Sequence, residues 1–380
     1  MPLRCSYTLV LAAFTFFIPI RSSAQTAGGP AAPSVTVSGY LQPQYAVVDD
    51  GNQSRDRIFF RRIMLTVDAN GQSGWNGEFQ VDAGPIASGG NRLIVKNAFL
   101  QYSGWRDRGV TMTIGNQKLP FSRSYYGSSS RRGLIERPFT GDRAFGTPGR
   151  ALAIKAEGSP RSKTVYWAAA LAATTSSADG GEIRLDGPAE AGTGLSEGPI
   201  LAGRVEFHPL GEVLRDHGDF ARGSVRFTVG AAAYRWWNDD DVSPQQIGSV
   251  NASHATGGEI SGGLRGHGVS VEAELERITV AAIDRQATSD LYSGGEAALN
   301  KASVEVGYMF VPAKFEWLAS ADMLDAATFA STWQRLSVGI NAYVNGHRLK
   351  FSLMHRESFN DAGTDGARSR QTFIQSQFAF

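Results

Sequence analysis

From residue 35 onward, apolar and polar side chains alternate along the chain with a period of two. Phe79 and Val81 occupy alternate positions, and Glu78, Gln80 and Asp82 lie beside and between them. Successive side chains of a β-strand point to opposite faces, so this pattern predicts a strand with one apolar and one polar face. Such segments predict an all-β protein of about sixteen strands, at residues 35–47, 63–69, 75–83, 94–102, 110–117, 151–158, 165–173, 201–208, 225–235, 256–265, 269–280, 302–310, 314–323, 336–344, 348–355 and 372–380.

The connections between the predicted strands alternate between short turns and long loops. Asn345-Gly346 is a strong signal for a two-residue hairpin turn, whereas residues 118–149 and 174–199 form long links. Short turns at one rim and long loops at the other are typical of a transmembrane antiparallel β-barrel, whose even strand number leaves no free edge. The sequence therefore predicts a barrel over residues 35–380. Residues 209–222 depart from this pattern, because they form a long link where a short turn is expected.

Aromatic residues lie near the ends of the predicted strands or on their apolar faces. In a membrane barrel such residues form girdles at the two interfaces, and in a soluble sandwich they fill the core. Sixteen strands in one domain favour the barrel, so we expect girdle positions for Trp75, Tyr102, Trp105, Tyr166, Trp167, Trp236, Trp237, Tyr308 and Trp333. The last strand ends at Phe380, the usual end of such barrels, where we expect the outer-membrane assembly machinery to bind.

The first 34 residues have the character of an export signal and a leader. Arg4 precedes a short apolar run from Tyr7 to Ile20, and Ser22-Ser23-Ala24 resembles a cleavage site. We expect a signal peptide over residues 1–24 and a flexible leader over residues 25–34. Cys5, the single cysteine, would be removed, which excludes disulfides and thiol chemistry. Two of the 37 basic residues would be lost with it, against 36 acidic ones, so the near-neutral mature chain indicates no nucleic-acid partner.

The most basic stretch of the chain is a loop rich in glycine, proline and serine. Only Glu136 and Asp142 oppose its seven cations, which are Lys118, Arg123, Arg131, Arg132, Arg137, Arg143 and Arg150. Apolar residues such as Phe121 and Phe139 indicate a packed loop, and it is the third long loop of the strand series. We predict that it folds into the barrel and lines an anion constriction. The alternatives are solvated rim charges, pairs with the two carboxylates, and an external loop that binds lipopolysaccharide phosphates.

Charged residues also occupy inward positions of the predicted strands. Parity predicts lumen-facing cations at Arg62, Arg204, Arg226, Arg348, Lys350 and Arg356. It also predicts an acidic wall, which consists of Glu259, Glu272, Glu274, Glu276, Glu305, Glu316 and Asp322. Facing the basic positions across the lumen, this wall would produce a transverse field and only a weak to moderate anion preference. The alternative is that these carboxylates pair with inward arginines.

Sequence signals for enzyme chemistry are weak. A serine hydrolase needs a placed nucleophile and a histidine base, and none of the six histidines lies in an HExxH or GxSxG-like setting. Asp239-Asp240-Asp241 lacks the spacing of a calcium-binding EF-hand loop and is better interpreted as a solvated acidic turn. We therefore expect no catalytic residues, no metal and no cofactor.

Several segments resemble the phosphate- and polyphosphate-selective porin family of Gram-negative outer membranes. They include FFRRIMLTVDANGQSGWNGEFQVDAG from Phe59, VKNAFLQYSG from Val95 and the stretch that begins TIGNQKLPFSRSYYG at Thr113. The resemblance implies a sixteen-stranded, typically trimeric channel in the outer membrane, with its third external loop folded into the lumen. The expected partners are small anions such as phosphate, the lipid bilayer, lipopolysaccharide and two further copies of the chain.

The function implied by the resemblance is passive diffusion of small anions, in particular phosphate or polyphosphate, through a basic constriction. Rings of Arg or Lys are the usual filter for anions and phosphate, and the planar fork of arginine suits phosphate oxygens. The alternatives are a general or carboxylate-preferring porin, and a plugged barrel that serves adhesion or envelope structure.

Overall fold

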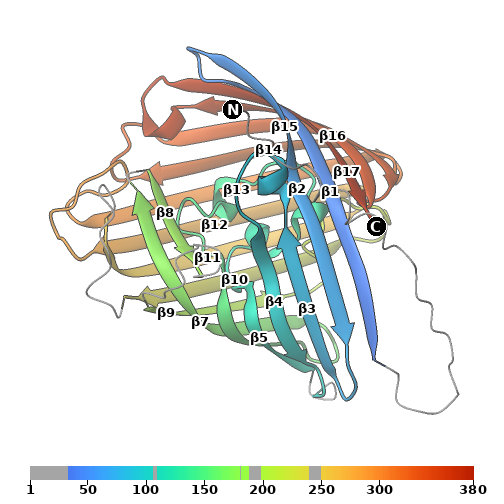
Figure 1. The fold of residues 1–380 in the computed structure, drawn as a ribbon. Coiled ribbons are helices and arrows are strands. Elements are labelled where there is room, and N and C mark those ends of the chain that lie inside the picture. Colours follow the sequence, from blue (N-terminus) through green and yellow to red (C-terminus); the bar gives the residue numbers. More distant parts are fainter. Residues whose placement is uncertain (1–32, 106–108, 180, 188–197, 239–249) are drawn as a thin grey trace, which may run out of the picture. The chain divides into compact units, whose positions relative to one another are not determined.

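Sixteen antiparallel strands close into a barrel in the computed structural model, which describes residues 33–105, 109–179, 181–187, 198–238 and 250–380 (Figure 1). β1 pairs with β2 on one side and with β17 on the other, which closes the sheet. The barrel strands are β1 (Ser34–Asp49), β2 (Ser54–Asn70), β3 (Trp75–Asp82), β4 (Ile94–Tyr102), β5 (Val110–Lys118), β6 (Arg150–Gly158), β7 (Val165–Asp179), β9 (Gly198–Phe207), β10 (Arg226–Trp237), β11 (Ala252–Gly266), β12 (Val269–Ala282), β13 (Glu296–Val311), β14 (Phe315–Ala326), β15 (Trp333–Asn345), β16 (Leu349–Phe359) and β17 (Arg368–Ala379).

The sixteen-stranded barrel predicted from the sequence is confirmed, with one addition. A short seventeenth strand, β8 (Glu182–Asp186), lies in the link after β7 and pairs with the end of that strand. β7 also pairs directly with β9, so β8 is not one of the strands that form the barrel wall. The predicted signal peptide, most of the leader and Asp239-Asp240-Asp241 lie outside the described residues. In the part of the chain that is described, no helix is long and apolar enough to cross a membrane.

The strands present an apolar face outward and a more polar face inward. On β12, Ala273 and Leu275 are exposed, whereas Glu274 and Glu276 are buried inside the barrel. On β11 and β14, Ile260 and Trp317 likewise point outward. An apolar outer band is what a bilayer requires, and the closed ladder satisfies the backbone hydrogen bonds that lipid cannot.

Only part of the predicted aromatic girdle lies on the outer surface. Trp75, Tyr102 and Trp105 form one group, with ring centroids 4.9 and 5.2 Å apart. Tyr308 and Trp317 are exposed on β13 and β14. The girdle positions predicted for Tyr166, Trp236 and Trp333 are wrong, because Trp236 is fully buried, Trp333 packs against Phe139 and Tyr166 lines an internal cavity. Strand ends alone do not distinguish the inner face from the outer one.

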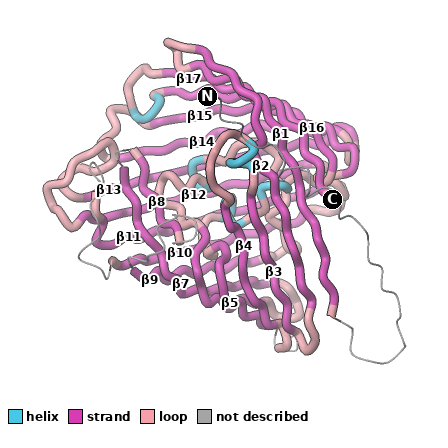
Figure 2. The backbone as a smooth tube through the Cα atoms, in the orientation of Figure 1, coloured by secondary structure: helices cyan, strands magenta, loops and turns pink. Residues whose placement is uncertain are grey.

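The long link between β5 and β6, residues 119–149, folds into the lumen and is named the constriction loop. It contains the short helix α2 (Arg123–Tyr126) and two 3-10 turns, Ser129–Arg131 and Phe139–Gly141. Figure 2 shows these helical turns within the ring of strands. The other helix, α1 (Gly84–Ala87), packs on β2 in the β3–β4 link, and a third 3-10 turn (Asp361–Gly363) joins β16 to β17.

A second segment enters the lumen from the opposite rim. The β9–β10 link, residues 208–225, lies at the rim where the other connections are short turns. Its residues Val213, His217 and Asp219 are all buried. The unusual length noted in the sequence therefore corresponds to an inward fold. The rim that carries the constriction loop is named the loop rim, and the opposite rim, which carries the β9–β10 link, is named the turn rim.

The barrel closes where the last residue meets the first strand. The Phe380 backbone N–H donates to the Gly39 carbonyl oxygen at 3.0 Å, and the Gly39 N–H donates to the Phe380 carbonyl oxygen at 3.3 Å. A Cβ atom on Gly39 would lie 2.8 Å from the Phe380 ring and would collide with the Met64 carbonyl oxygen. Glycine at this position lets the terminal ring pack directly on the strand backbone.

We predict that Gly39→Val weakens barrel closure. Overpacking of this kind costs about 1–3 kcal/mol, so the temperature at which the folded barrel unfolds in detergent gel electrophoresis should fall by several degrees. Gly258→Val is the matched control, because a Cβ at exposed Gly258 meets no atom within 4 Å. Equal unfolding temperatures for the two variants would contradict the role of Gly39.

Candidate functional site

The constriction loop is held to one side of the barrel by buried ion pairs. Arg123 Nε lies 2.7 Å from Glu272 Oε2 on β12, and its Nη1 lies 3.4 Å from Glu206 Oε1 on β9. Arg132 Nη2 lies 3.2 Å from Glu305 Oε2 on β13. Both arginine side chains are at most 4% exposed. Breaking such a buried pair leaves an uncompensated charge, so these contacts fix the position of the loop.

The acidic wall predicted from strand parity does face inward, but it does not face an open lumen. Glu272 and Glu305 bind loop arginines, and Asp322 accepts a hydrogen bond from the Phe139 N–H at 3.2 Å. The remaining wall carboxylates also have partners, which include Arg204 for Glu259 at 2.8 Å, Lys301 for Glu276 at 2.5 Å, Ser124 for Glu274 and Tyr343 for Glu316. Five of the seven carboxylates pair with an Arg or Lys side chain, so the alternative of internal pairing is observed for these five, whereas Glu274 and Glu316 have neutral partners and the transverse field stays a prediction.

Apolar contacts support the same side of the loop. The Phe139 ring packs on Phe145 and Trp333, with centroids 5.6 and 4.7 Å away, and Phe121 packs on Tyr234 at 4.8 Å. Phe121 and Phe139 are at most 1% exposed. The loop is packed, as its apolar residues predicted, and it fills the half of the lumen next to the acidic wall.

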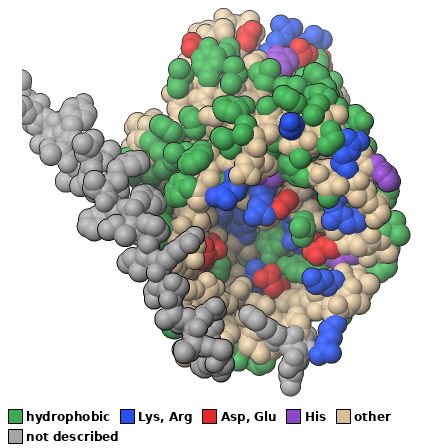
Figure 3. Space-filling model, turned by 90° about the vertical axis from the view of Figure 1, so that its right-hand side faces the viewer, with side chains coloured by type: hydrophobic (Ala, Val, Ile, Leu, Met, Phe, Trp, Pro, Cys, Tyr) green, Lys and Arg blue, Asp and Glu red, His purple; other side chains and the backbone are tan. Residues whose placement is uncertain are grey.

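The other half of the lumen contains a cavity of about 940 Å³ between the loop and strands β2 to β7. Thirteen of its lining residues are Lys or Arg and only five are Asp or Glu. Figure 3 shows a hollow in one face of the molecule, with Lys and Arg side chains and a few acidic ones around it. Pairing with the loop removes acidic groups from the water-filled space, so the cavity keeps a surplus of positive charge.

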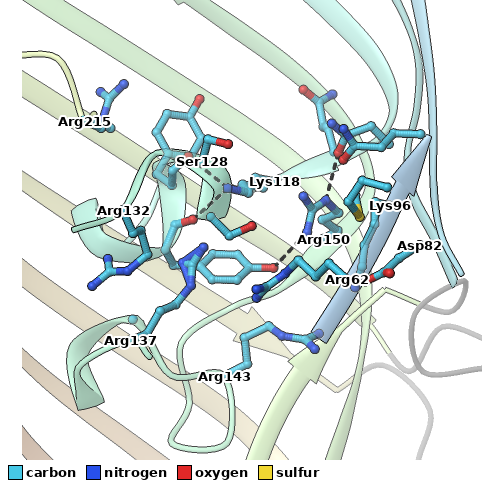
Figure 4. Close-up of a pocket in the computed structure, with 18 of the residues that line it drawn as sticks. Arg62, Asp82, Lys96, Lys118, Ser128, Arg132, Arg137, Arg143, Arg150 and Arg215 are labelled. Atoms are coloured by element: carbon cyan, nitrogen blue, oxygen red, sulfur yellow. Dashed lines mark hydrogen bonds between the residues drawn. The ribbon is translucent and has the colours of Figure 1, made fainter. Parts of the chain in front are cut away.

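Four arginines from three elements converge in the cavity. Figure 4 shows Arg62 from β2, Arg150 from β6, and Arg137 and Arg143 from the loop pointing toward one another, whereas Arg132 points away. Arg150 Nε donates to Asn97 Oδ1 at 2.8 Å, and Arg137 Nη1 donates to the Ser124 carbonyl at 2.9 Å. These hydrogen bonds orient two of the guanidinium groups, and Arg143 Nη1 pairs with Asp186 Oδ1 at 2.8 Å.

Lys118 combines a structural contact with a place in the cavity. Its ammonium donates to the carbonyl oxygens of Tyr125 (2.9 Å), Tyr126 (3.1 Å) and Gly127 (2.6 Å), which end helix α2. Carbonyl groups at the end of a helix favour a cation. Lys118 therefore holds the turn of the loop while it contributes charge to the lining.

The charged groups around Arg137 of the constriction loop favour a bound anion. Burial, followed by the neighbouring Arg132 and Arg62 guanidinium groups, lowers the pKa of Arg137 to about 9, which leaves it charged at neutral pH. Burial disfavours a charge of either sign, whereas the Arg132 and Arg62 contribution marks a positive potential, which favours an anion. Burial alone would raise the pKa of Glu136, but Arg61 and Arg356 outweigh it and hold that pKa at about 2. Arg61 Nη2 lies 3.0 Å from Glu136 Oε2, so this carboxylate is ionised and neutralises one cation.

Some of the residues predicted for the site line the cavity, and others do not. Of the loop set, Lys118, Arg132, Arg137, Arg143 and Arg150 line the cavity, together with the strand residues Arg62 and Arg356. Arg123 is buried in the wall, and Arg131 is a largely exposed partner of Asp216. Four strand cations do not line it: Arg204 pairs with Glu259, Arg226 lies 3.8 Å from Asp219, Lys350 donates to the Arg132 carbonyl, and Arg348 is exposed in the β15–β16 turn.

Sequence reasoning missed several lining cations. They are Arg61, Lys96, Lys155, Arg184, Arg215 and Arg335. Lys155 could have been found, because Leu152 and Ile154 on the same strand point outward and its parity is opposite. Arg215 carries no such signal, because it lies in an irregular link. In the described part of the chain, no group of three His, Cys, Asp or Glu residues could hold a metal ion.

A closed barrel with an apolar outer band and a charged lumen narrowed by an internal loop defines an outer-membrane channel. The sequence profile of a family described as phosphate-selective porin O and P matches residues 35–241. The chain belongs to this family, and it is a protein of the Gram-negative outer membrane, as the resemblance implied.

Solved outer-membrane proteins share the fold at low sequence identity. A loop-deletion mutant of OmpT, an outer membrane protein of Vibrio cholerae, is 13% identical with a TM-score of 0.60, over 92% of this chain and all of that one. The channel DcaP of Acinetobacter baumannii is 12% identical, with a TM-score of 0.54 over 93% and 100%. Salmonella typhi OmpF, in complex with daunomycin, is 11% identical, with a TM-score of 0.57 over 90% and 97%. No curated protein sequence matches the chain.

We predict that Arg123→Ala loosens the constriction loop. Removing one partner of a buried ion pair typically costs about 3–5 kcal/mol, so single-channel recordings should show higher conductance and more flicker. The matched change is Arg131→Ala, because Arg131 is 58% exposed and its pair with Asp216 is worth little. Recordings in which both variants behave alike would contradict the assignment of Arg123 as the anchor of the loop.

Proposed function

We propose that this outer-membrane channel passes small anions by diffusion, with phosphate and polyphosphate as its preferred solutes. The observation that carries the proposal is the composition of the cavity, where thirteen cationic residues stand against five acidic ones. A narrow, water-filled space with a positive surplus raises the local anion concentration and compensates for the hydration that an entering anion loses.

Arginine chemistry supports phosphate as the solute class. A guanidinium group is planar, stays charged, and can donate two parallel hydrogen bonds to a phosphate. Arg62, Arg137 and Arg150 approach the same part of the cavity from three different elements, so an anion can pass from one to the next. Because each contact is shared and exposed to water, each one holds the anion weakly, and the anion can leave.

A general or carboxylate-preferring pore is the second candidate, and the five lining carboxylates favour it. Glu78, Asp82, Glu136, Asp142 and Glu157 lie among the cations of the cavity. Glu157 is 3.2 Å from Lys155, and Glu136 binds Arg61, so part of the positive surplus is neutralised. A plugged barrel is less well supported, because a cavity of about 940 Å³ stays open beside the loop.

The assembly implied by the proposal is a homotrimer in the outer membrane. Strands β3 to β6 are only 8 or 9 residues long, and this low wall exposes Phe79, Leu100 and Leu152. A trimeric form of the similar Vibrio cholerae OmpT has been solved. We further propose lipopolysaccharide as a neighbour of the loop rim, and recognition of the strand that ends at Phe380 by the assembly machinery.

We predict that Arg137→Gln and Arg150→Gln each reduce anion selectivity, because each removes a positive charge from the cavity lining. In a planar bilayer with a potassium chloride gradient, the zero-current potential should shift toward cations, and the phosphate concentration that half-blocks the chloride current should rise several-fold. Arg370→Gln is the matched control, since Arg370 is exposed on β17 and pairs with Glu357.

Glu136→Gln should have the opposite effect. It frees Arg61 from its partner and removes one cavity carboxylate, so the zero-current potential should move further toward anions. A native protein that prefers cations, or whose chloride current is insensitive to phosphate, would refute the proposed function. Phosphate-insensitive chloride current with a clear anion preference would favour the general pore.

A further inference from the structure

The β9–β10 link docks on the constriction loop from the opposite rim of the barrel. The His217 backbone N–H donates to the Arg131 carbonyl at 2.8 Å, and the exposed pair of Arg131 with Asp216 adds little to this contact. Arg123 Nη2 donates to the Val213 carbonyl at 3.0 Å. These contacts join the two segments directly, so the link takes part in setting the shape of the lumen.

Both segments also share carboxylates of the barrel. Glu305 on β13 accepts Arg132 of the loop at 3.2 Å and lies 2.7 Å from His217 Nδ1 of the link. Glu206 on β9 lies 3.4 Å from Arg123 of the loop and 2.9 Å from Arg215 Nη2 of the link. The wall thus positions the loop and the link together.

This docking carries Arg215 into the cavity. Its guanidinium carbon lies 4.8 Å from the centroid of the Tyr126 ring and 5.0 Å from that of the Tyr166 ring, and the side chain is 21% exposed. Glu206 is shared among three arginines, because it also lies 2.8 Å from Arg204 and forms an ion pair with Arg123. Its charge therefore does not fully neutralise Arg215. Two aromatic faces fix the plane of the guanidinium group. Its Nε and Nη2 atoms are buried, so Nη1 is the nitrogen through which Arg215 lines the cavity.

Arg215 lies at a different depth from the arginine group of Figure 4. Its neighbours Lys155 and Glu157 stand five and seven residues beyond Arg150 on β6, toward the turn rim. At about 3.3 Å per residue, five residues correspond to roughly 16 Å along the strand. Figure 4 shows Arg215 set apart from Arg62, Arg137, Arg143 and Arg150.

Two other cations line the cavity near Arg215, namely Lys118, whose ammonium donates to the Tyr126 and Gly127 carbonyls, and Lys155. Lys155 Nζ lies 3.2 Å from Glu157 Oε2, and that oxygen also accepts the Tyr166 hydroxyl at 2.7 Å. Lys155 and Glu157 therefore compensate each other. Arg215 and Lys118 are the cations through which this part of the cavity can contact a passing anion.

We propose that Arg215 is a specificity-determining residue, an anion contact at the turn-rim end of the channel, supplied by the β9–β10 link and separate from the constriction loop. The inference rests on the proposed anion function. The solute class is a small oxyanion such as phosphate, because Arg215 carries a fixed positive charge and can donate a charge-assisted hydrogen bond to an anion oxygen. An anion that passes the arginine group meets this second site before it leaves.

The test compares phosphate block of the chloride current from each side of a planar bilayer. Inorganic phosphate is added to one chamber at a time, and the half-blocking concentration is measured against voltage. In Arg215→Gln we expect the half-blocking concentration to rise about tenfold for phosphate added on the turn-rim side, because one charge-assisted hydrogen bond is lost. The change for phosphate added on the loop-rim side should be smaller. Arg215→Lys keeps the charge without the fork and should recover part of the block.

Two reference variants make the result interpretable. Arg222→Gln removes a cation from the same link, where Arg222 donates to the main-chain carbonyls of Met309 and His267, and it should leave the block unchanged. Arg137→Gln should weaken block from both sides. The second site is supported if the half-blocking phosphate concentration rises in Arg215→Gln and stays the same in Arg222→Gln.

Other outcomes overturn the inference in distinguishable ways. If Arg215→Gln raises conductance and flicker but leaves the half-blocking phosphate concentration unchanged, Arg215 only positions the loop. If Arg137→Gln weakens the block and Arg215→Gln does not, the proposed function stands and the second site fails. If the native channel shows neither anion preference nor phosphate block, the proposed function fails, and this inference fails with it.

Discussion

The ion pairs between the constriction loop and the inward carboxylates of strands β9, β12 and β13 determine the architecture of the lumen. Arg123 and Arg132 enter these pairs almost fully buried, and Asp322 accepts the backbone N–H of Phe139. A long loop with only short helical turns would otherwise have little to hold it in one place. Because a buried charge without a partner is costly, the loop and the wall each require the other.

This pairing also decides the sign of the remaining space. The carboxylates of the wall are taken out of contact with the water-filled cavity, whereas Arg62 and Arg137 in the cavity donate to the neutral oxygens of Gln42 and Ser124. The chain as a whole is close to neutral, with 37 basic and 36 acidic residues, yet the cavity is strongly basic. The sign of the charge in the cavity depends on which charges are covered, and the overall charge of the chain does not indicate it.

The β9–β10 link extends the same principle to the other rim. It uses Glu206 and Glu305, which already bind the loop, and so couples two segments that are far apart in sequence. A change in one of these carboxylates would disturb both segments at once. The lumen is thus shaped by one connected set of charges, and its two ends are not independent.

The sequence alone determined the barrel and the basic loop. Period-two alternation and the alternation of turns with loops predict sixteen strands, because strand geometry is local. The richness of residues 118–150 in arginine, with few carboxylates, is a local property too, and five of the seven predicted cations do line the cavity.

Only the tertiary structure decided which charges remain available. Parity places Glu272 and Glu305 inward, but it cannot show that Arg123 and Arg132 cover them, since those partners are more than 140 residues away in sequence. Arg215 belongs to an irregular link whose direction no periodicity encodes, and its place between Tyr126 and Tyr166 depends on three separate elements. Strand faces follow from local geometry, whereas the cancellation of charge depends on long-range packing.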